Sequence, residues 1–271
     1  MRFAICNELF ENLPLAEVAR TCADLGYEGL ELAPFTLGPH PSALTTSERR
    51  QLRLDVEAAG TKVVGLHWLL ARTTGFHLTA PEPAIRQRTA VRLAELAELC
   101  RDLGGELLVL GAPQQRSLPP GMPTSEGMRL AADTLAQVLP ALERHQVDLC
   151  LEPLGPSETN FLNTCAEAVA LAQSLDHPRV RLHLDVKAMA SETVPITDLI
   201  RQYGSLARHF HANDPNRRGP GFGALDFMPL FAALKEVGYR GWVSVEVFDY
   251  SPDPLTIARE SLRTMRRCLA T

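Results

Sequence analysis

The run VRLHLD at residues 180–185 is short and largely apolar, and it ends on a carboxylate. Three other runs in the second half of the chain share this form, each with a carboxylate or an imidazole near its end: LCLEP (149–153), ARHFHAN (207–213) and WVSVEV (242–247). Because a barrel of parallel strands gathers its strand C-termini at one face, four such endings would converge there. Three oxygen ligands and one nitrogen ligand suit Mn²⁺, Mg²⁺, Co²⁺ or Zn²⁺ and leave room for a substrate. We therefore predict a site for one divalent metal ion formed by Glu152, Asp185, His211 and Glu246.

The whole chain alternates short β-branched or Leu-rich runs with longer amphipathic ones. The strands expected from the short runs are 3–6, 29–32, 62–67, 106–110, 148–152, 180–185, 208–212 and 242–246. The helices expected from the longer runs are 15–26, 47–60, 84–104, 127–146, 165–175, 227–238 and 254–269. This alternation predicts an α/β fold, a single (β/α)₈ TIM barrel that occupies residues 1–271 as one domain. The alternative, an open doubly wound sheet, needs a Gly-rich phosphate turn after the first strand, and CNELFENLP (6–14) lacks one.

Composition narrows the class of protein and of partner. The 271 residues carry a net charge of −5 and no basic run, which argues against binding to nucleic acid through bulk electrostatics. No run approaches the roughly 18 apolar residues of a membrane span, and the N-terminus does not have the form of a signal peptide. The six cysteines are scattered and form no C-x-x-C pair, which favours a reducing compartment. We expect a cytoplasmic protein without a membrane partner. A homodimer is one option for its oligomeric state, which the sequence leaves open.

Four segments around the predicted ligands resemble a known family. They are EPLGPSETNFLNT (152–164), HLDVKAM (183–189), HFHANDPNRRGPGFGALDF (209–227) and GWVSVEVF (241–248). These segments are similar to the xylose-isomerase-like TIM-barrel superfamily, and most of all to its sugar isomerase/epimerase branch, which includes D-tagatose and D-psicose 3-epimerases and inosose isomerase. The resemblance extends along the whole chain, and it is strongest from about residue 152 onward.

The resemblance implies a metal-dependent isomerase. The family's four metal ligands fall on Glu152, Asp185, His211 and Glu246, with Mn²⁺ as the first choice of ion. In ketohexose epimerases the two glutamates are also the catalytic residues, since one removes the proton next to the carbonyl and the other returns it. A divalent cation on the carbonyl and its neighbouring hydroxyl stabilises the enediolate between these steps.

The same resemblance implies several substrate contacts. Glu158 matches the second acid of the family segment, and Arg217 matches an arginine that binds substrate oxygens. His67, which closes the third expected strand, is expected to line the sugar pocket. Where the epimerases carry D-x-x-H, this chain reads Asp185-Val186-Lys187-Ala188, so an imidazole that holds a substrate hydroxyl is absent. Lys187 is therefore expected to contact the substrate, either as a cation for a phosphate or carboxylate or as an acid or base; pairing with a surface acid is the alternative.

Three functions fit these observations to different degrees. The first is a sugar epimerase or aldose–ketose isomerase. The second is a metal-dependent lyase or dehydratase acting on a keto sugar or cyclic polyol after the same proton abstraction. The third is a sugar-binding barrel without catalysis, which gives no reason for two glutamates at a metal. The related apurinic endonucleases need a further histidine at the position of Ala188 and a basic face, and both are missing. The identity of the sugar, and whether it is phosphorylated, is left open.

Overall fold

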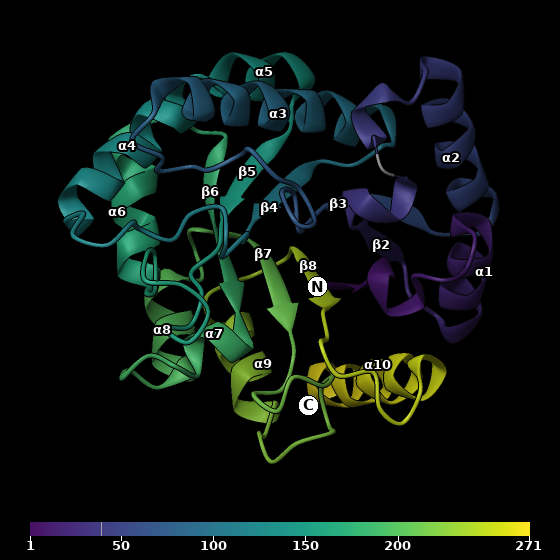
Figure 1. Cartoon of the computed structure of the whole chain (residues 1–271). Helices are drawn as coiled ribbons and strands as arrows, with labels where there is room; N and C mark the ends of the chain where they lie inside the picture. The colour runs from purple at the N-terminus through teal and green to yellow at the C-terminus, as the bar shows by residue number, and fades with distance from the viewer. Residues whose placement is uncertain (39) are drawn as a thin grey trace.

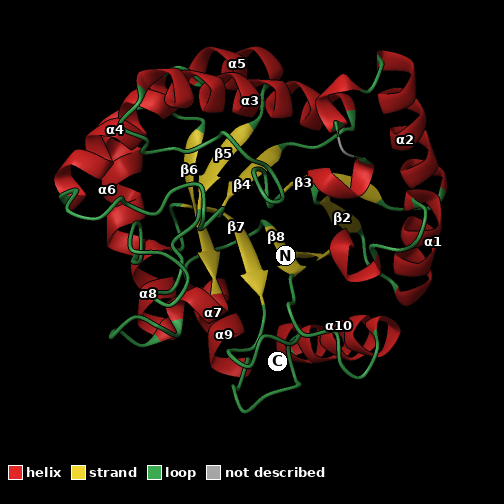
Figure 2. Cartoon of the chain, viewed as in Figure 1, coloured by secondary structure: helices red, strands yellow, loops and turns green. Residues whose placement is uncertain are grey.

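The computed structural model describes residues 1–38 and 40–271 and shows a closed barrel of parallel strands ringed by helices (Figures 1 and 2). Strand order follows the sequence, and β1 pairs with β8 to close the ring. The strands are β1 (Arg2–Cys6), β2 (Gly29–Leu32), β3 (Lys62–Leu66), β4 (Leu107–Leu110), β5 (Asp148–Leu151), β6 (Val180–Asp185), β7 (Ala207–Ala212) and β8 (Trp242–Val245). The predicted (β/α)₈ barrel is confirmed, and the eight expected strands are present with ends displaced by no more than one residue.

The helices lie on the outside of the barrel, as Figure 2 shows. They are α1 (Leu15–Leu25), α2 (Thr46–Ala58), α3 (Pro83–Asp102), α4 (Thr124–Ala136), α5 (Leu139–His145), α6 (Cys165–Leu175), α7 (Val186–Met189), α8 (Ile196–Tyr203), α9 (Met228–Glu236) and α10 (Pro254–Ala270). Three short 3₁₀ helices are also present: η1 (Asn7–Phe10), η2 (Pro34–Leu37) and η3 (Pro41–Ala43).

Two parts of the helical pattern differ from expectation. The single helix expected over 127–146 is wrong, because α4 ends at Ala136 and α5 begins at Leu139. Pro140 has no N–H to donate to the carbonyl of Ala136, so the helix cannot run through this point unbroken. The helices α7 and α8 were not expected, since four and eight residues are too few to display a clear period.

Alternating strand residues fill the barrel interior in two layers. An apolar cluster lies near the strand starts and comprises Ala4, Val64, Leu107, Val109, Cys150 and Trp242. Further along the strands the interior becomes polar, with Glu31, His183, His209, His211 and Ser244 all completely buried. Such a layer is costly unless its groups satisfy one another or bind a ligand, so it locates the chemistry at the C-terminal ends of the strands.

All six cysteines are free and buried. Across residues 1–38 and 40–271, no helix combines the length and the apolar character needed to cross a bilayer.

Candidate active site

Four ligand-type side chains from consecutive strands meet at the C-terminal face of the barrel. Asp185 on β6 is in register with His211 on β7, so these two residues are direct neighbours. Glu152 follows β5 and Glu246 follows β8, which places the glutamates at the two ends of the row. His211 Nδ1 lies 3.2 Å from Glu246 Oε2, 4.0 Å from Asp185 Oδ2 and 4.0 Å from Glu152 Oε1. Glu152, Asp185 and Glu246 thus all approach His211 Nδ1. Glu152, Asp185 and His211 form, with His183, a group whose ligand atoms lie within 4.8 Å of one another, whereas Glu246 groups with Glu8 and His67.

Glu31, the third residue of β2, fixes the orientation of the His211 ring. His211 Nε2 lies 3.0 and 3.1 Å from the two Glu31 oxygens, and His209 Nε2 lies 2.6 Å from Glu31 Oε2. A carboxylate that accepts a hydrogen bond from Nε2–H leaves the lone pair on Nδ1, the nitrogen that faces the other three ligands. Glu31 is completely buried and is therefore a support for His211 rather than part of an open pocket.

Asp185 is held by two donors that arise from the local turn. Its Oδ1 accepts from the backbone N–H of Ala188 at 2.7 Å, as the N-cap of α7. Its Oδ2 accepts from the side-chain amide of Asn213 at 2.6 Å. The Asn213 oxygen in turn accepts from the backbone N–H of Lys187 at 2.8 Å, which ties the ends of β6 and β7 together. Both carboxylate oxygens of Asp185 are therefore oriented before any ligand binds.

Glu152 depends on the absence of a side chain at Gly111. A Cβ atom at this position would lie 1.7 Å from Glu152 Oε2, so any other residue would displace the carboxylate from the position it takes here. Burial and the neighbouring charges of Glu246 and Asp185 hold the pKa of Glu152 well above its usual range. The backbone carbonyl of Glu152 accepts from the buried guanidinium of Arg116 at 2.7 Å. Arg116 was not predicted as part of the site, since a lone arginine in a loop carries no distinctive pattern.

Glu246 has a different environment. Its Oε1 accepts from the indole N–H of Trp68 at 2.7 Å, while its Oε2 faces His211. Burial on its own raises the pKa of Glu246, but His211 more than offsets this effect and lowers it. Trp68 has a backbone φ of 50° and lies against Phe248 and Phe35, with ring centroids 5.8 Å apart in each pair. This aromatic stack fixes the direction in which the indole N–H points.

The four convergent residues fit a divalent cation. Three buried carboxylates around one imidazole nitrogen repel one another, and burial and Glu246 raise the pKa of Asp185 just as that of Glu152 is raised. A 2+ ion relieves this repulsion, and the three-oxygen, one-nitrogen donor set suits Mn²⁺, Mg²⁺, Co²⁺ or Zn²⁺. The supported orientations of His211 and Asp185 match the outer partners that metal ligands usually have.

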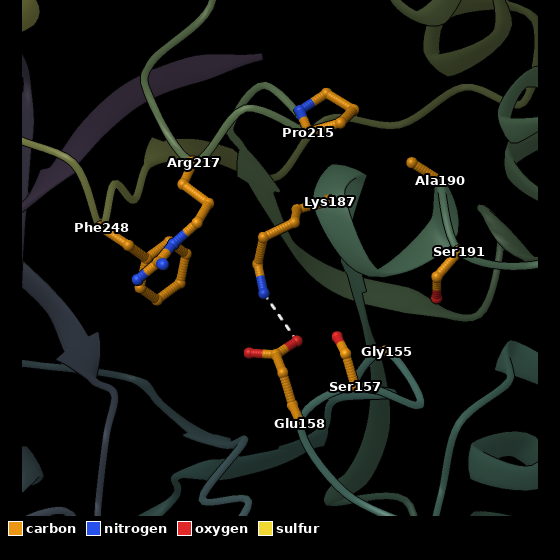
Figure 3. Close-up of a pocket in the computed structure, with 9 residues that line it drawn as sticks. All are labelled: Gly155, Ser157, Glu158, Lys187, Ala190, Ser191, Pro215, Arg217 and Phe248. Carbon is orange, nitrogen blue, oxygen red and sulfur yellow. Dashed lines mark hydrogen bonds and ion pairs between the residues drawn. The ribbon is translucent and has the colours of Figure 1, made fainter.

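A cavity of about 520 Å³ opens among the loops that follow β5, β6, β7 and β8 (Figure 3). Three predicted substrate contacts line it, namely Glu158, Lys187 and Arg217. Lys187 Nζ donates to Glu158 Oε2 at 2.7 Å, so Lys187 pairs with an acid that lines the same cavity and not with one that draws it away from the site. Burial lowers the pKa of Lys187, but the nearby acids outweigh this effect and raise it.

His67 lies apart from this cavity. It is completely buried, and its Nε2 is 2.8 Å from Glu8 Oε2. Neither residue is among those that line the cavity. The contact expected between His67 and a sugar therefore stays a prediction.

Comparison with known proteins places this geometry in context. The sequence model of the Xylose isomerase-like TIM barrel family matches residues 19–268, in agreement with the resemblance inferred from the residues. A D-psicose 3-epimerase of Ruminiclostridium cellulolyticum is 28% identical over 228 residues, which are 83% of this chain and 75% of that relative. A fructoselysine 3-epimerase of Escherichia coli O157:H7 is 24% identical over 273 residues, covering 96% of this chain and 95% of that protein.

Solved structures share the fold along the full length. A crystal structure of D-psicose 3-epimerase in the presence of D-fructose superposes with a TM-score of 0.87 at 20% identity and covers 100% of both chains. A 3-keto-D-glucoside 4-epimerase from E. coli gives a TM-score of 0.85 at 22% identity, with 99% of this chain and 100% of that chain covered.

Proposed function

Because the chain belongs to the Xylose isomerase-like TIM barrel family, we propose that it is a divalent-metal-dependent sugar epimerase, an isomerase that moves a proton at a carbon next to a carbonyl. Relatives along most of its length are ketose 3-epimerases, which supports this class of reaction. Glu152, Asp185, His211 and Glu246 would hold one ion, with Mn²⁺ as our first choice. When bound, this ion supplies positive charge that stabilises the negative charge developing on the substrate oxygens.

Glu152 and Glu246 are the catalytic acid–base pair in this proposal. They occupy the two ends of the ligand row, with Asp185 and His211 between them. Epimerisation needs a proton to leave one face of a carbon and another to arrive at the opposite face, so two carboxyl groups on separate strands suit it. Their hydrogen bonding also differs. Trp68 donates to Glu246, whereas among residues 1–38 and 40–271 no donor is hydrogen-bonded to the Glu152 carboxylate.

The remaining residues bind and orient the substrate. Lys187, Glu158 and Arg217 would contact the part of the sugar that extends into the cavity they line, and His67 would also contact the sugar. Trp68 and Phe248 stack with ring centroids 5.8 Å apart and would give the sugar an apolar wall. The observation that carries the proposal is the approach of three carboxylates to within 4.0 Å of His211 Nδ1.

Exchange with solvent tests this function directly. The Mn²⁺-loaded protein is incubated in D₂O with a panel of ketoses and 3-keto sugars, and recovered sugars are analysed by NMR and mass spectrometry. We expect one deuterium at the epimerised carbon of at least one sugar and none with Glu246→Gln. No deuterium incorporation into any neutral or charged sugar of the panel, in protein that holds about one metal ion per chain, would contradict the proposal.

The same assay separates the lyase alternative. A lyase would also abstract the proton next to the carbonyl, but it would then expel water or an aglycone and give an unsaturated product. The cavity beside the site offers space for a leaving group, which is consistent with the lyase alternative. An unsaturated product in place of a deuterated epimer would assign the chain to that class. A cytoplasmic location stays a prediction.

A further inference from the structure

His183 is a completely buried histidine that the four-ligand metal site does not use. It lies on β6 two residues before Asp185, and because strand side chains alternate, both side chains point into the barrel. His183 is in register with His209 on β7, just as Asp185 is in register with His211. The His183 imidazole therefore lies one layer of side chains nearer the strand starts than Asp185 and His211.

Both ring nitrogens of His183 lack a partner. Neither Nδ1 nor Nε2 forms a hydrogen bond in the part of the chain that the structure describes. A neutral imidazole carries one donor and one acceptor, and leaving both buried and unpaired is unfavourable. The neighbouring rings differ, because Glu31 lies within hydrogen-bond distance of Nε2 of both His209 and His211. The unpaired nitrogens of His183 thus indicate a function other than packing.

The Nε2 atom of His183 faces the proposed metal ligands. It lies 3.7 Å from Glu152 Oε1, which is too far for a hydrogen bond. The same carboxylate oxygen lies 4.0 Å from His211 Nδ1. Glu152, His183, Asp185 and His211 each offer one ligand atom to a group in which all atoms lie within 4.8 Å of one another. Donors bound to one ion at about 2.0–2.2 Å lie up to about 4.4 Å apart, so small side-chain rotations bring these four onto one ion.

Packing holds the His183 ring in this orientation. The ring meets that of His211 in a T-shaped contact with centroids 4.1 Å apart, and the His209 ring lies at 5.3 Å. The flanking residues Leu182 and Leu184 are buried in the main apolar core. These contacts fix the strand and keep His183 on its inner side.

We propose that His183 is a further ligand of the metal centre, which donates through Nε2 and gives the site a second nitrogen. The inference rests on the metal site of the proposed epimerase and specifies its ligand set. Within residues 1–38 and 40–271, no acceptor bonds to Nδ1 of His183 in the way that Glu31 supports Nε2 of His211. His183 is therefore the weaker of the two nitrogen ligands.

A second imidazole changes which ions the site prefers. Imidazole nitrogen suits Zn²⁺ and other late first-row metals, whereas carboxylate oxygen suits Mg²⁺ and Mn²⁺. His183 should therefore increase the affinity for Co²⁺ and Zn²⁺ more than the affinity for Mn²⁺.

Pulsed EPR of the Mn²⁺-loaded protein tests the proposal by counting the nitrogens bound to the ion. The protein is prepared with ¹⁵N-labelled histidine, so that each coordinated imidazole gives a nuclear coupling that assigns it to histidine. We expect two coordinated imidazoles in the unmodified protein. A count of one would overturn the proposal without any substitution.

Variants identify the second nitrogen. His183→Gln should reduce the count to one. His209→Gln is the matched control, since His209 is buried as completely on the neighbouring strand and glutamine keeps a side-chain N–H for Glu31. Its count should stay at two. A count of two that persists in His183→Gln would assign the second nitrogen to another histidine and overturn the proposal.

Metal affinities give a second measurement, made by calorimetry on the same variants. The affinity of His183→Gln for Co²⁺ and Zn²⁺ should fall roughly ten- to a hundredfold, and its affinity for Mn²⁺ by less. A purely structural role of His183 would lower all three affinities alike. Equal losses for the three ions would therefore contradict the proposal.

Failure of this inference and failure of the proposed function can be told apart. One nitrogen at the ion, in protein that introduces deuterium into a sugar from D₂O, would overturn the His183 ligand and leave the epimerase function standing. Two nitrogens that depend on His183, in protein that labels no sugar of the panel, would support the ligand and contradict the proposed reaction. A chain that binds no divalent ion would overturn both.

Discussion

Replacing Trp68 with Phe would remove one hydrogen bond from the proposed base and little else. The indole N–H donates to Glu246 Oε1 at 2.7 Å, and Phe keeps an aromatic ring against Phe248 and Phe35. The other oxygen of Glu246, Oε2, faces His211 and is not touched by the change. The variant therefore separates the orientation of Glu246 as a base from its role as a ligand.

The magnitude follows from the kind of bond that is lost. A hydrogen bond to a charged group contributes about 1.5–3 kcal/mol, and about 1.4 kcal/mol corresponds to tenfold in rate. We expect kcat of Trp68→Phe to fall by roughly ten- to a hundredfold, with Mn²⁺ affinity changed by less than about threefold. Because the N–H stabilises the ionised carboxylate, its removal should also raise the pKa of Glu246 and move the acidic limb of the rate profile to higher pH.

The assay is steady-state epimerisation of whichever ketose the solvent-exchange panel identifies, measured across pH, with Mn²⁺ binding followed by calorimetry. Phe35→Leu is the control, since it trims the stack on the other side of Trp68 but leaves the N–H in place. Unchanged turnover and an unchanged pH profile in Trp68→Phe would refute the reasoning. A loss confined to metal binding would refute it as well.

Three further predictions test the supports of the site. Glu31→Gln should weaken Mn²⁺ binding by about 10- to 100-fold in calorimetry, because the charged acceptor that fixes the tautomer of His211 becomes a weaker, neutral one. Unchanged affinity would contradict this role. Gly111→Ala should displace the Glu152 carboxylate, since its Cβ would lie 1.7 Å from Glu152 Oε2. Turnover should then fall at least roughly tenfold, as expected when a catalytic carboxyl group is misplaced. A wild-type rate would refute the steric argument. Burial and like charges raise the pKa of Glu152, so protons compete with the metal for this carboxylate. Mn²⁺ affinity should therefore begin to fall, as the pH is lowered, at a pH well above the ordinary glutamate pKa of about 4.3. A Mn²⁺ affinity that stays constant down to that pH would contradict this prediction.

The strands of this barrel were predictable because parallel strands buried on both faces read as short apolar runs. All eight lie within one residue of expectation at each end. The error over 127–146 has a local cause. Apolar residues continue at helical spacing through this range, and the periodicity outweighed the signal of Pro140, where the helix in fact divides.

The ligand set was also predictable, since strand-end residues share one face once the barrel is accepted. What the sequence did not indicate are the partners of those ligands. Glu31 and His211 are 180 residues apart, and Trp68 and Glu246 are 178 apart, so no local spacing joins them. Such pairs arise only when the barrel closes and brings β2 and the end of β3 across from β7 and β8.

The ion pair between Lys187 and Glu158, in the cavity outside the ligand cluster, is a second contact that the sequence did not indicate. The sequence revealed that an expected imidazole was replaced by Ala188 and that a lysine lay beside it, but not which acid that lysine would meet. Once the pair is seen, Lys187 and Glu158 form one charged pair on the wall of the cavity, which Arg217 also lines. We propose that the inner cluster carries the reaction and that the residues lining the outer cavity select the substrate. Specificity in this chain should therefore change with Lys187 and Arg217 while the chemistry at Glu152 and Glu246 stays the same.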